Sequence, residues 1–219
     1  LAPRYINYKE NIMTNQTNNI NQTNNINNTN HINHTNHINH INHTNHINHI
    51  NKTAIITGAS RGIGAAIAKK LASCGYNLSL CCRNSSDRLK ALADELHCAY
   101  GIEVLCYTGN VGDFFFAKDM VANTISHFGH IDVLINNAGI SHIGLLSDMT
   151  PEEWNNIVAI NLTGVFNFTK LVIPYMVADK CGRILQISSV WGNVGASCEV
   201  AYSACKGGIN AFTKALGKE

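Results

Sequence analysis

Apolar and polar positions alternate in two different ways along the chain, with a change near residue 51. From residue 52 onward, short apolar runs are separated by longer segments in which apolar residues recur at helical spacing. The runs predict strands over 53–57, 77–82, 102–107, 131–135 and 183–188. The periodic segments predict helices over 63–73, 87–100, 113–128, 151–177 and 201–216. Strands that alternate with helices are typical of an α/β fold with a parallel, doubly wound sheet.

Two helix starts are marked by their residues. Asp113 opens one predicted helix, and Thr150-Pro151-Glu152-Glu153 opens the longest one. The second sequence combines an N-cap threonine, a proline at the first helical position and two acidic residues in the first turn. It therefore predicts a well-defined start for the helix over 151–177.

The first fifty residues have no such pattern. Every residue from 14 to 51 is Asn, Gln, Thr, Ile or His, and a nonapeptide at 31–39 is repeated unchanged at 40–48. So few apolar residues cannot bury enough surface to offset the entropy lost when the chain is ordered. We therefore expect a disordered low-complexity tail over 1–50 and a globular domain over 51–219.

Histidines in the tail recur at every third position. They are His31, His34, His37, His40, His43, His46 and His49. In a polyproline-II conformation they would share one face and could chelate zinc, nickel or copper. A translated nucleotide repeat gives the same pattern without a function, and we favour that interpretation, so we expect no functional metal site.

Composition excludes several classes of function. The formal net charge of the 219 residues is +2. The sequence has no stripe of basic residues of the kind that indicates nucleic-acid binding. The chain shows no long apolar run that indicates a membrane span and no apolar core of a signal peptide, so we expect a cytoplasmic protein. The eight cysteines form no Cys-x-x-Cys motif, which favours reduced thiols that pack as small buried hydrophobes.

A glycine-rich sequence, Thr57-Gly58-Ala59-Ser60-Arg61-Gly62-Ile63-Gly64, follows the first predicted strand. Gly58 permits a tight turn, Gly62 lets backbone approach a pyrophosphate, and Gly64 lets the next helix pack closely. A loop that only reverses the chain is the alternative. The position after the first strand of a βαβ unit favours nucleotide binding.

A second candidate site lies near the end of the chain. Ser189 follows the last predicted strand, and Tyr202 and Lys206 lie one helical turn apart. A free phenol has a pKa of about 10, and a neighbouring ammonium favours the phenolate, so such a pair can act as an acid or base. The spacing alone is weak, because Tyr5 and Lys9 match it too.

Five motifs together carry a family resemblance. They are Thr57–Gly64, Asn136-Asn137-Ala138-Gly139, Asn161, Ser189 and Tyr202-x-x-x-Lys206. In this order and spacing, residues 51–219 resemble the short-chain dehydrogenase/reductase family, which implies a Rossmann-like fold. Within it the chain is most similar to the 3-oxoacyl-acyl-carrier-protein reductases, through Ala59–Gly64, Asn161–Phe166 and Gly182-Arg183-Ile184.

The resemblance implies roles for four catalytic residues. Tyr202 would protonate the carbonyl oxygen, Lys206 would support Tyr202 and hold the nicotinamide ribose, and Ser189 would bind the substrate carbonyl. Asn161 would hold a water in the proton relay. Taken singly, Ser189 can also be a strand-end cap, and Asn161 a helical polar residue bonded to backbone.

The resemblance also implies a cofactor site. Its residues are Gly58, Ser60, Arg61, Gly62, Ile63, Gly64, Arg83, Asn110, Val111, Asn137, Ala138, Gly139, Tyr202 and Lys206. Related proteins that prefer NAD carry an acid after the second strand, where this chain has Arg83, so we expect NADP(H), with Arg61 and Arg83 on the 2′-phosphate. Asn110 stands where the family usually has Asp, and its amide oxygen can still accept a bond from adenine.

The substrate implied is a small or carrier-bound ketone, such as a 3-oxoacyl thioester. The loop over 190–199 should line its pocket, and Trp191, Cys198 and Glu199 are unusual for a fatty-acid reductase. They resemble a bacterial subgroup that reduces the 5-aminopentanone group on elongation factor P. Glu199 could pair with a substrate amine, or be a solvated loop acid, which we favour.

Two further expectations follow from the family's longer chain. Family members continue with two more strands, so we expect the strand over 183–188 to lie at an edge, with Leu1–Ile12 at best an imperfect sixth strand beside it. The helices over 151–178 and 201–216 are surfaces through which the family dimerises, so we expect a homo-oligomer, a dimer or a tetramer. The rival hypothesis is a fragment that binds nucleotide without catalysing reduction.

Overall fold

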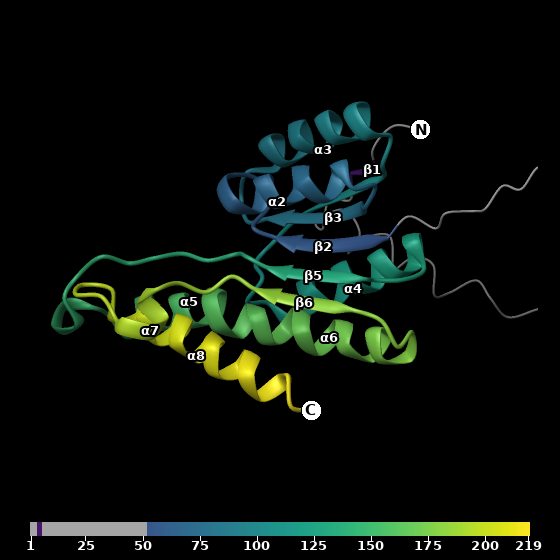
Figure 1. Ribbon diagram of the computed structural model, residues 1–219. Helices are drawn as coiled ribbons and strands as arrows, with labels where there is room; N and C mark the ends of the chain where they lie inside the picture. The colour runs from purple at the N-terminus through teal and green to yellow at the C-terminus, as the bar shows by residue number, and fades with distance from the viewer. Residues whose placement is uncertain (1–3, 6–51) are drawn as a thin grey trace, which may run out of the picture. The chain divides into compact units, whose positions relative to one another are not determined.

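A single parallel sheet organises the part of the chain that the computed structural model describes, residues 4–5 and 52–219. The strands are β1 (Arg4–Tyr5), β2 (Thr53–Thr57), β3 (Asn77–Cys82), β4 (Val104–Thr108), β5 (Val133–Asn136) and β6 (Arg183–Gln186). They are arranged in the order β1-β4-β3-β2-β5-β6, and every neighbouring pair is parallel (Figure 1). The predicted Rossmann-like α/β fold is confirmed.

Helices cover both faces of this sheet. The described helices are α2 (Gly62–Ser73), α3 (Ser86–Tyr100), α4 (Phe114–Phe128), η1 (Leu146–Asp148), α5 (Pro151–Val158), η2 (Ala159–Thr163), α6 (Gly164–Ala178), α7 (Trp191–Val194) and α8 (Val200–Leu216). Side chains alternate between faces along each strand. Ala54 and Ile56 pack in a core cluster with α2 and α3, whereas Ile55 packs with α4 and α6.

The sheet topology positions a site at the carboxyl end of β2. The chain passes from β2 to β3 and β4 on one side, and then returns to β5 and β6 on the other. Where the direction reverses, between β2 and β5, the two following loops separate and leave a crevice, which is where α/β sheets bind ligands. The glycine-rich loop after β2 and the loop after β5 border this point.

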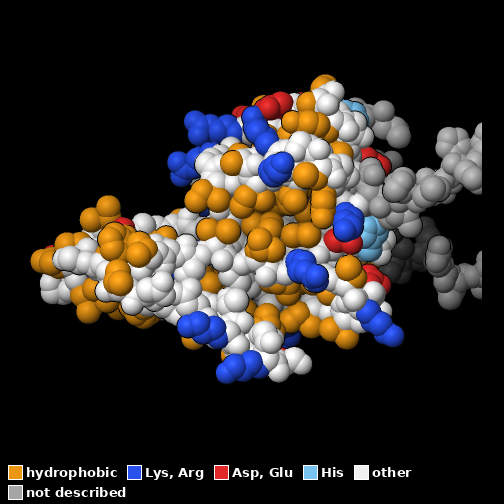
Figure 2. Space-filling view, viewed as in Figure 1, with side chains coloured by type: hydrophobic (Ala, Val, Ile, Leu, Met, Phe, Trp, Pro, Cys, Tyr) orange, Lys and Arg blue, Asp and Glu red, His pale blue; other side chains and the backbone are white. Residues whose placement is uncertain are grey.

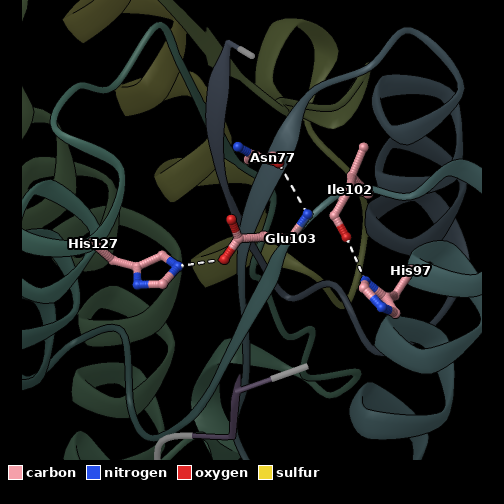
Figure 3. Close-up of polar contacts among 5 residues, drawn as sticks. All are labelled: Asn77, His97, Ile102, Glu103 and His127. Atoms are coloured by element: carbon pink, nitrogen blue, oxygen red, sulfur yellow. Dashed lines mark hydrogen bonds and ion pairs between the residues drawn. The ribbon is translucent and has the colours of Figure 1, made fainter. Parts of the chain in front are cut away.

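The opposite end of the sheet is held together by polar contacts around the start of β4 (Figure 3). Glu103 donates its backbone N–H to Oδ1 of Asn77 at 2.9 Å, and its carboxylate contacts Nε2 of His127 at 2.8 Å. His97 Nδ1 lies 2.8 Å from the carbonyl oxygen of Ile102. These contacts join α3, α4 and β3 to the turn before β4, far along the strands from the crevice.

Several predicted elements differ in detail from the structure. The strands predicted over 102–107 and 131–135 begin later, at Val104 and Val133. The helix predicted over 151–177 is interrupted by the π-helical turn η2, and the loop over 190–199 contains the short helix α7. The capping box of Thr150 and Glu153 and the N-cap role of Asp113 are confirmed.

The expected sixth strand is found at a different edge. We expect Leu1–Ile12 beside the strand over 183–188, but the described residues of that segment, Arg4–Tyr5, pair with Leu105 and Cys106 of β4. This prediction is therefore wrong, because β4 and β6 lie toward opposite edges of the sheet. The predicted edge position of the strand that begins at Arg183 is confirmed for the described residues, where β6 has β5 as its neighbour.

Two further expectations can be compared with the structure, and the first of them, that the cysteines are buried, needs correction. Cys74, Cys98 and Cys181 are exposed rather than buried, although all eight cysteines are free thiols. By length and composition alone, the helical segment Pro151–Ala178 could cross a membrane, with a mean hydropathy of 1.5 over its most apolar window. Half of that window is buried, and Val165, Phe168 and Val172 pack against the sheet. This fits the core helix of a soluble domain.

Candidate active site

A cavity of about 690 Å³ opens at the carboxyl ends of β2, β3, β4 and β5. Its walls are the glycine-rich loop, the turns after β3 and β4, and the segment after β5. Of the residues predicted to bind a cofactor, it is lined by Gly58, Ser60, Arg61, Gly62, Ile63, Arg83, Asn110, Val111, Asn137, Ala138 and Gly139. The structure thus brings together residues that lie up to 81 positions apart in the chain, from Gly58 to Gly139.

Glycine is required at two points of the loop for different reasons. Gly58 has φ +67°, and a Cβ added there would lie 2.9 Å from Cα of Ala138. A Cβ at Gly64 would collide with the carbonyl oxygen of Gly58 and with Asn137 Nδ2. Backbone and amide atoms cannot move aside cheaply, so any side chain at Gly64 would push α2 away from the loop.

Thr57 and Asn137 hold this loop against the end of β5. Oγ1 of Thr57, which is buried, accepts the backbone N–H groups of Asn137 and Ala138, each at 3.0 Å. Nδ2 of Asn137 donates to the carbonyl oxygens of Thr57 at 3.0 Å and Gly58 at 3.1 Å. Asn137 therefore shapes the cavity wall, and its amide nitrogen is already used by the loop.

The start of α2 is suited to an anion. Its N-cap residue Arg61 is extended and makes no side-chain capping bond, so the first N–H groups of the helix have no capping partner among the described residues. The helix dipole adds positive potential at the same point, which the cavity exposes. A dinucleotide pyrophosphate fits this donor set, with Gly62 and Ile63 offering backbone rather than side chains.

The far side of the cavity combines basic and amide groups. Arg61 and Arg83 are both exposed and line it, together with Ser85 at the start of α3. Oδ1 of Asn110 accepts the backbone N–H of Gly112 at 3.1 Å, so one of its two acceptor positions is occupied. Cys82 is buried there, and burial raises the pKa of its thiol.

Lys206 and Tyr202 lie one turn apart in α8, as the sequence predicts. Nζ of Lys206 donates to the carbonyl oxygen of Ile187 at 2.6 Å and lies 5.5 Å from the centroid of the Tyr202 ring. The lysine is 4 % exposed, and this burial lowers its pKa, an effect that Cys205 partly opposes. A buried ammonium beside a phenol favours the phenolate and can assist proton transfer.

The inner wall of the cavity meets this pair at Gly139. A Cβ at Gly139 would lie 2.7 Å from Oδ1 of Asn161 and 3.7 Å from Nζ of Lys206. The side-chain amide of Asn161 accepts the N–H of Ile140 and donates to the carbonyl oxygens of Ile140 and Ile157. This amide is therefore bonded to backbone, as one of the two interpretations predicts, and it lies in the π-helical turn η2.

Ser189 precedes α7 at the end of the loop after β6. Its Oγ accepts the backbone N–H of Trp191 at 3.2 Å, which leaves its proton available to donate to a substrate oxygen. The neighbouring Ser188 donates to the carbonyl oxygen of Lys206 at 3.0 Å, and α7 packs its Gly192 directly against the Lys206 backbone. These contacts bring the serine segment alongside Tyr202 and Lys206.

A sequence profile of the short chain dehydrogenase family matches residues 52–219. The chain belongs to the short chain dehydrogenase family. Its members are oxidoreductases that interconvert carbonyl and alcohol groups, so this chain is an oxidoreductase of the same kind.

Curated relatives of this dehydrogenase share about two fifths of its aligned residues. It is 39 % identical over 168 residues to the 3-oxoacyl-[acyl-carrier-protein] reductase FabG of Staphylococcus aureus, which covers 77 % of this chain and 68 % of the relative. The corresponding reductase of Synechocystis is 40 % identical with the same coverage. The D-beta-hydroxybutyrate dehydrogenase of Cupriavidus necator is 39 % identical, with 64 % of its length covered.

Solved structures show the same fold. A metagenomic short-chain oxidoreductase in complex with NADP gives a TM-score of 0.73 at 34 % identity, covering 76 % of this chain and 75 % of that one. An alcohol dehydrogenase from Thermococcus sibiricus, complexed with 5-hydroxy-NADP, gives 0.72 at 32 % identity, with coverages of 75 % and 69 %.

Sequence reasoning missed three contributors to this dehydrogenase site. Thr57 was part of the glycine-rich motif without a role, yet its hydroxyl joins the two loops. Ile187 supplies the acceptor for Lys206 through its backbone, and Gly192 allows α7 to approach α8. The role of the Ile187 carbonyl has no signal in the sequence, because every residue has a backbone carbonyl. Gly192 could have been noticed, because it lies in the loop over 190–199 that the sequence predicts to line the pocket.

Proposed function

We propose that this short chain dehydrogenase reduces a ketone with NADPH, using Tyr202 as the proton donor. The observation that carries the proposal is the buried Lys206, whose ammonium is fixed by Ile187 O and lies against the Tyr202 ring next to the cavity wall at Gly139. A buried charge without a function is unfavourable, so its place between phenol and cavity supports a catalytic role.

Each residue has a task in this scheme. The α2 N-terminus and the glycine-rich loop hold the pyrophosphate, and Gly139 and Asn137 border the nicotinamide position. The cofactor supplies the hydride, which is its own chemistry. Ser189 donates a hydrogen bond to the substrate carbonyl oxygen, and Tyr202 transfers its proton to that oxygen as it gains charge. Asn161 keeps the segment after β5 in place through Ile140.

Preference for NADPH over NADH is supported by charge. Arg61, after β2, and Arg83, after β3, line the cavity, and no carboxylate lines it among the described residues. Figure 2 shows basic side chains gathered beside α2 and α3, on the side toward which the strands of Figure 1 point. An arginine pair can bind a 2′-phosphate, whereas a free ribose hydroxyl gains little from it.

A 3-oxoacyl thioester is the ketone that we propose first. The reductases of Staphylococcus aureus and Synechocystis are named for such a substrate. The loop before α5 and the segment that contains α7 carry exposed apolar residues: Ile143, Leu145, Leu146, Val190 and Val194. Figure 2 shows hydrophobic side chains gathered at the end of the molecule where Figure 1 places these segments. This surface suits an acyl chain better than a polar substrate.

One observation favours a second candidate, the 5-aminopentanone group on elongation factor P. Glu199 is partly buried one turn before Tyr202, and its Oε1 accepts the hydroxyl proton of Ser141 at 2.6 Å. The carbonyl of Cys198 accepts the N–H of Gly144 at 2.9 Å, so both loops are fixed around this carboxylate. A fixed carboxylate near the phenol suits a ketone that carries an amine.

The proposal is tested by following NADPH oxidation with purified protein. We expect turnover of acetoacetyl thioester, a preference for NADPH over NADH, and loss of turnover in Tyr202→Phe. Tyr100→Phe is the matched control and should retain activity, because the Tyr100 side chain is exposed at the end of α3. Equal efficiency with NADH would contradict the cofactor assignment, and faster turnover of the modified factor would select the second substrate.

Cofactor binding without any ketone reduction would favour the rival hypothesis of a nucleotide-binding protein. Binding is measured separately, through quenching of tryptophan fluorescence by NADPH. We propose a cytoplasmic location for the enzyme, which its eight free cysteines support, since disulfides are rare in that compartment.

A further inference from the structure

A buried polar cluster lies beneath the segment that holds Lys206. Asn136 ends β5, Gln186 ends β6, and the two are paired in the sheet register. Asn136 Nδ2 at 3.1 Å and Gln186 Nε2 at 3.2 Å both donate to Oγ1 of Thr169 in α6. Asn136 is 3 % exposed and Thr169 is 1 % exposed. A single hydroxyl therefore joins two neighbouring strand ends to the helix that covers them.

Stability alone does not account for this cluster. Oδ1 of Asn136 and Oε1 of Gln186 are buried and have no hydrogen-bond partner among the described residues. Unpaired buried oxygens are unfavourable, and apolar side chains of similar shape would hold the strands and helix together at least as well. The hydrogen bonds to Thr169, by contrast, hold the groups that they join in one arrangement, which apolar contacts specify less closely.

The geometry that the cluster fixes is that of Ile187. This residue follows Gln186 directly, and its N–H donates to the carbonyl oxygen of Asn136 at 2.9 Å. Its own carbonyl oxygen accepts Nζ of Lys206 at 2.6 Å. A movement of either amide that Thr169 holds would displace the acceptor on which the buried ammonium depends.

We propose that Thr169 is a positioning residue that places the ammonium of Lys206 beside Tyr202, acting through Asn136, Gln186 and the carbonyl of Ile187. The inference rests on the proposed function, because it assigns a catalytic task to Lys206. Thr169 contacts neither substrate nor cofactor in this scheme. Its hydroxyl fixes the position of the Lys206 ammonium.

Few titratable groups lie near Lys206, so a pH profile can report its position. The titratable groups beside its side chain are Tyr202 and Cys205, both in α8. The segments packed against it, 139–140, 161 and 187–192, contain no Asp, Glu, His, Lys, Arg, Cys or Tyr. Displacement of the ammonium is therefore expected to act mainly on the phenol of Tyr202.

Two substitutions separate the hydroxyl from the shape of the side chain. Thr169→Val removes the acceptor and keeps the branched shape, whereas Thr169→Ser keeps the hydroxyl. The matched control is Thr124→Val in α4, which removes an equally buried hydroxyl that contacts Ser79 and the carbonyl of Met120. Its loss should lower stability without touching β5, β6 or Lys206.

The first readout is the pH profile of the reverse reaction, NADP⁺-dependent oxidation of a 3-hydroxyacyl thioester. In Thr169→Val we expect the rising limb to move to higher pH, because a displaced ammonium favours the phenolate less. We also expect kcat at neutral pH to fall about tenfold, since small misplacements of catalytic groups have effects of this order. Thr169→Ser should restore the wild-type profile, and Thr124→Val should leave it unchanged.

The second readout needs no turnover. In protein with ¹³C-labelled lysine, the Lys206 signal, assigned through its absence in Lys206→Met, should titrate at lower pH in Thr169→Val than in wild type. Failure of the wild type to act on any ketone would defeat the proposed function but leave this readout intact. An unchanged Lys206 titration in folded Thr169→Val, or an equal shift in Thr124→Val, would overturn the positioning role.

Discussion

A lysine that is almost fully buried is the most informative single residue of this dehydrogenase. Lys206 donates a short hydrogen bond to the carbonyl oxygen of Ile187 and lies over an aromatic ring, but neither contact replaces the water that burial removes. Its lowered pKa expresses this deficit. Burial of this residue therefore opposes folding, and the proposed chemistry at Tyr202 accounts for its retention.

The cost of burying Lys206 predicts a pH dependence of stability. Its pKa is lower in the folded protein than the ordinary value of 10.5. Between these two values the unfolded chain binds more protons, so the free energy of unfolding rises with pH until about 10.5. The Lys206→Met variant has no titratable group at this position, so it lacks this contribution. Urea unfolding at a series of pH values should show wild type gaining stability relative to the variant as pH rises from neutral, while the variant loses ketone reduction. A difference that stays constant with pH would contradict this account.

Gly64 gives a second prediction for a single residue. Gly64→Ala places a methyl group against the Gly58 carbonyl and Asn137 Nδ2, so α2 must move from the loop that faces the cavity. Overpacking of this kind costs about 1–3 kcal/mol. We expect lower stability in urea unfolding and much weaker NADPH binding by fluorescence. Gly217→Ala, at the end of α8 with an added Cβ at ordinary contact distance, is the control and should change neither.

At the scale of elements, features that depend on adjacent residues follow from the sequence more closely than features that depend on partners distant in the chain. The start of α5 follows from four adjacent residues, Thr150 to Glu153, and the glycine loop follows from its place after a strand. The π-helical turn at Asn161 depends on an amide that bonds Ile140, from a different loop. The pairing of β1 with β4 rather than β6 also depends on partners distant in sequence, and no local pattern specifies them.

The same distinction applies to the site. Tyr202, Lys206 and Ser189 could be named from motifs, because their residue types carry the chemistry. The hydroxyls of Thr57 and Thr169 and the carbonyl of Ile187 could not, since ordinary residue types acquire these roles only through the packing of β5, β6 and α6.

The capping box of α5 predicts the stability of one helix start. Oγ1 of Thr150 accepts the N–H of Glu153 at 3.2 Å, and the Glu153 carboxylate accepts the N–H of Thr150 at 2.9 Å. Thr150→Ala removes one of these bonds and should lower the free energy of unfolding by about 1 kcal/mol. Thr150→Ser keeps the hydroxyl and should remain close to wild type in the same urea titration. Equal losses in both variants would show that the methyl group, rather than the cap, matters.

At the scale of the whole molecule, the long helical segment Pro151–Ala178 leaves three aromatic side chains partly uncovered. The segment α5–η2–α6 buries one side against the sheet, while Phe166 is 45 % exposed and Tyr175 and Trp154 are each 38 % exposed. Lys170 lies 5.4 Å from the centroid of the Phe166 ring and covers part of it. Aromatic side chains at this exposure on one long helix are typical of a protein interface.

These exposed aromatic side chains lead us to expect a homo-oligomer, a dimer or a tetramer formed through α5, α6 and α8. Light scattering coupled to size-exclusion chromatography should give a mass above that of the 23.9 kDa chain. Phe166→Glu places a charge in the expected interface, so it should shift the measured mass toward that of the monomer. This shift should be larger at low protein concentration. Phe115→Glu is the matched control, because Phe115 is 69 % exposed on α4, outside the helices expected to associate. A wild-type mass equal to one chain at all concentrations would exclude the oligomer. Loss of association in both variants would instead place the interface elsewhere, since a charge on α4 then acts as strongly as one on α6.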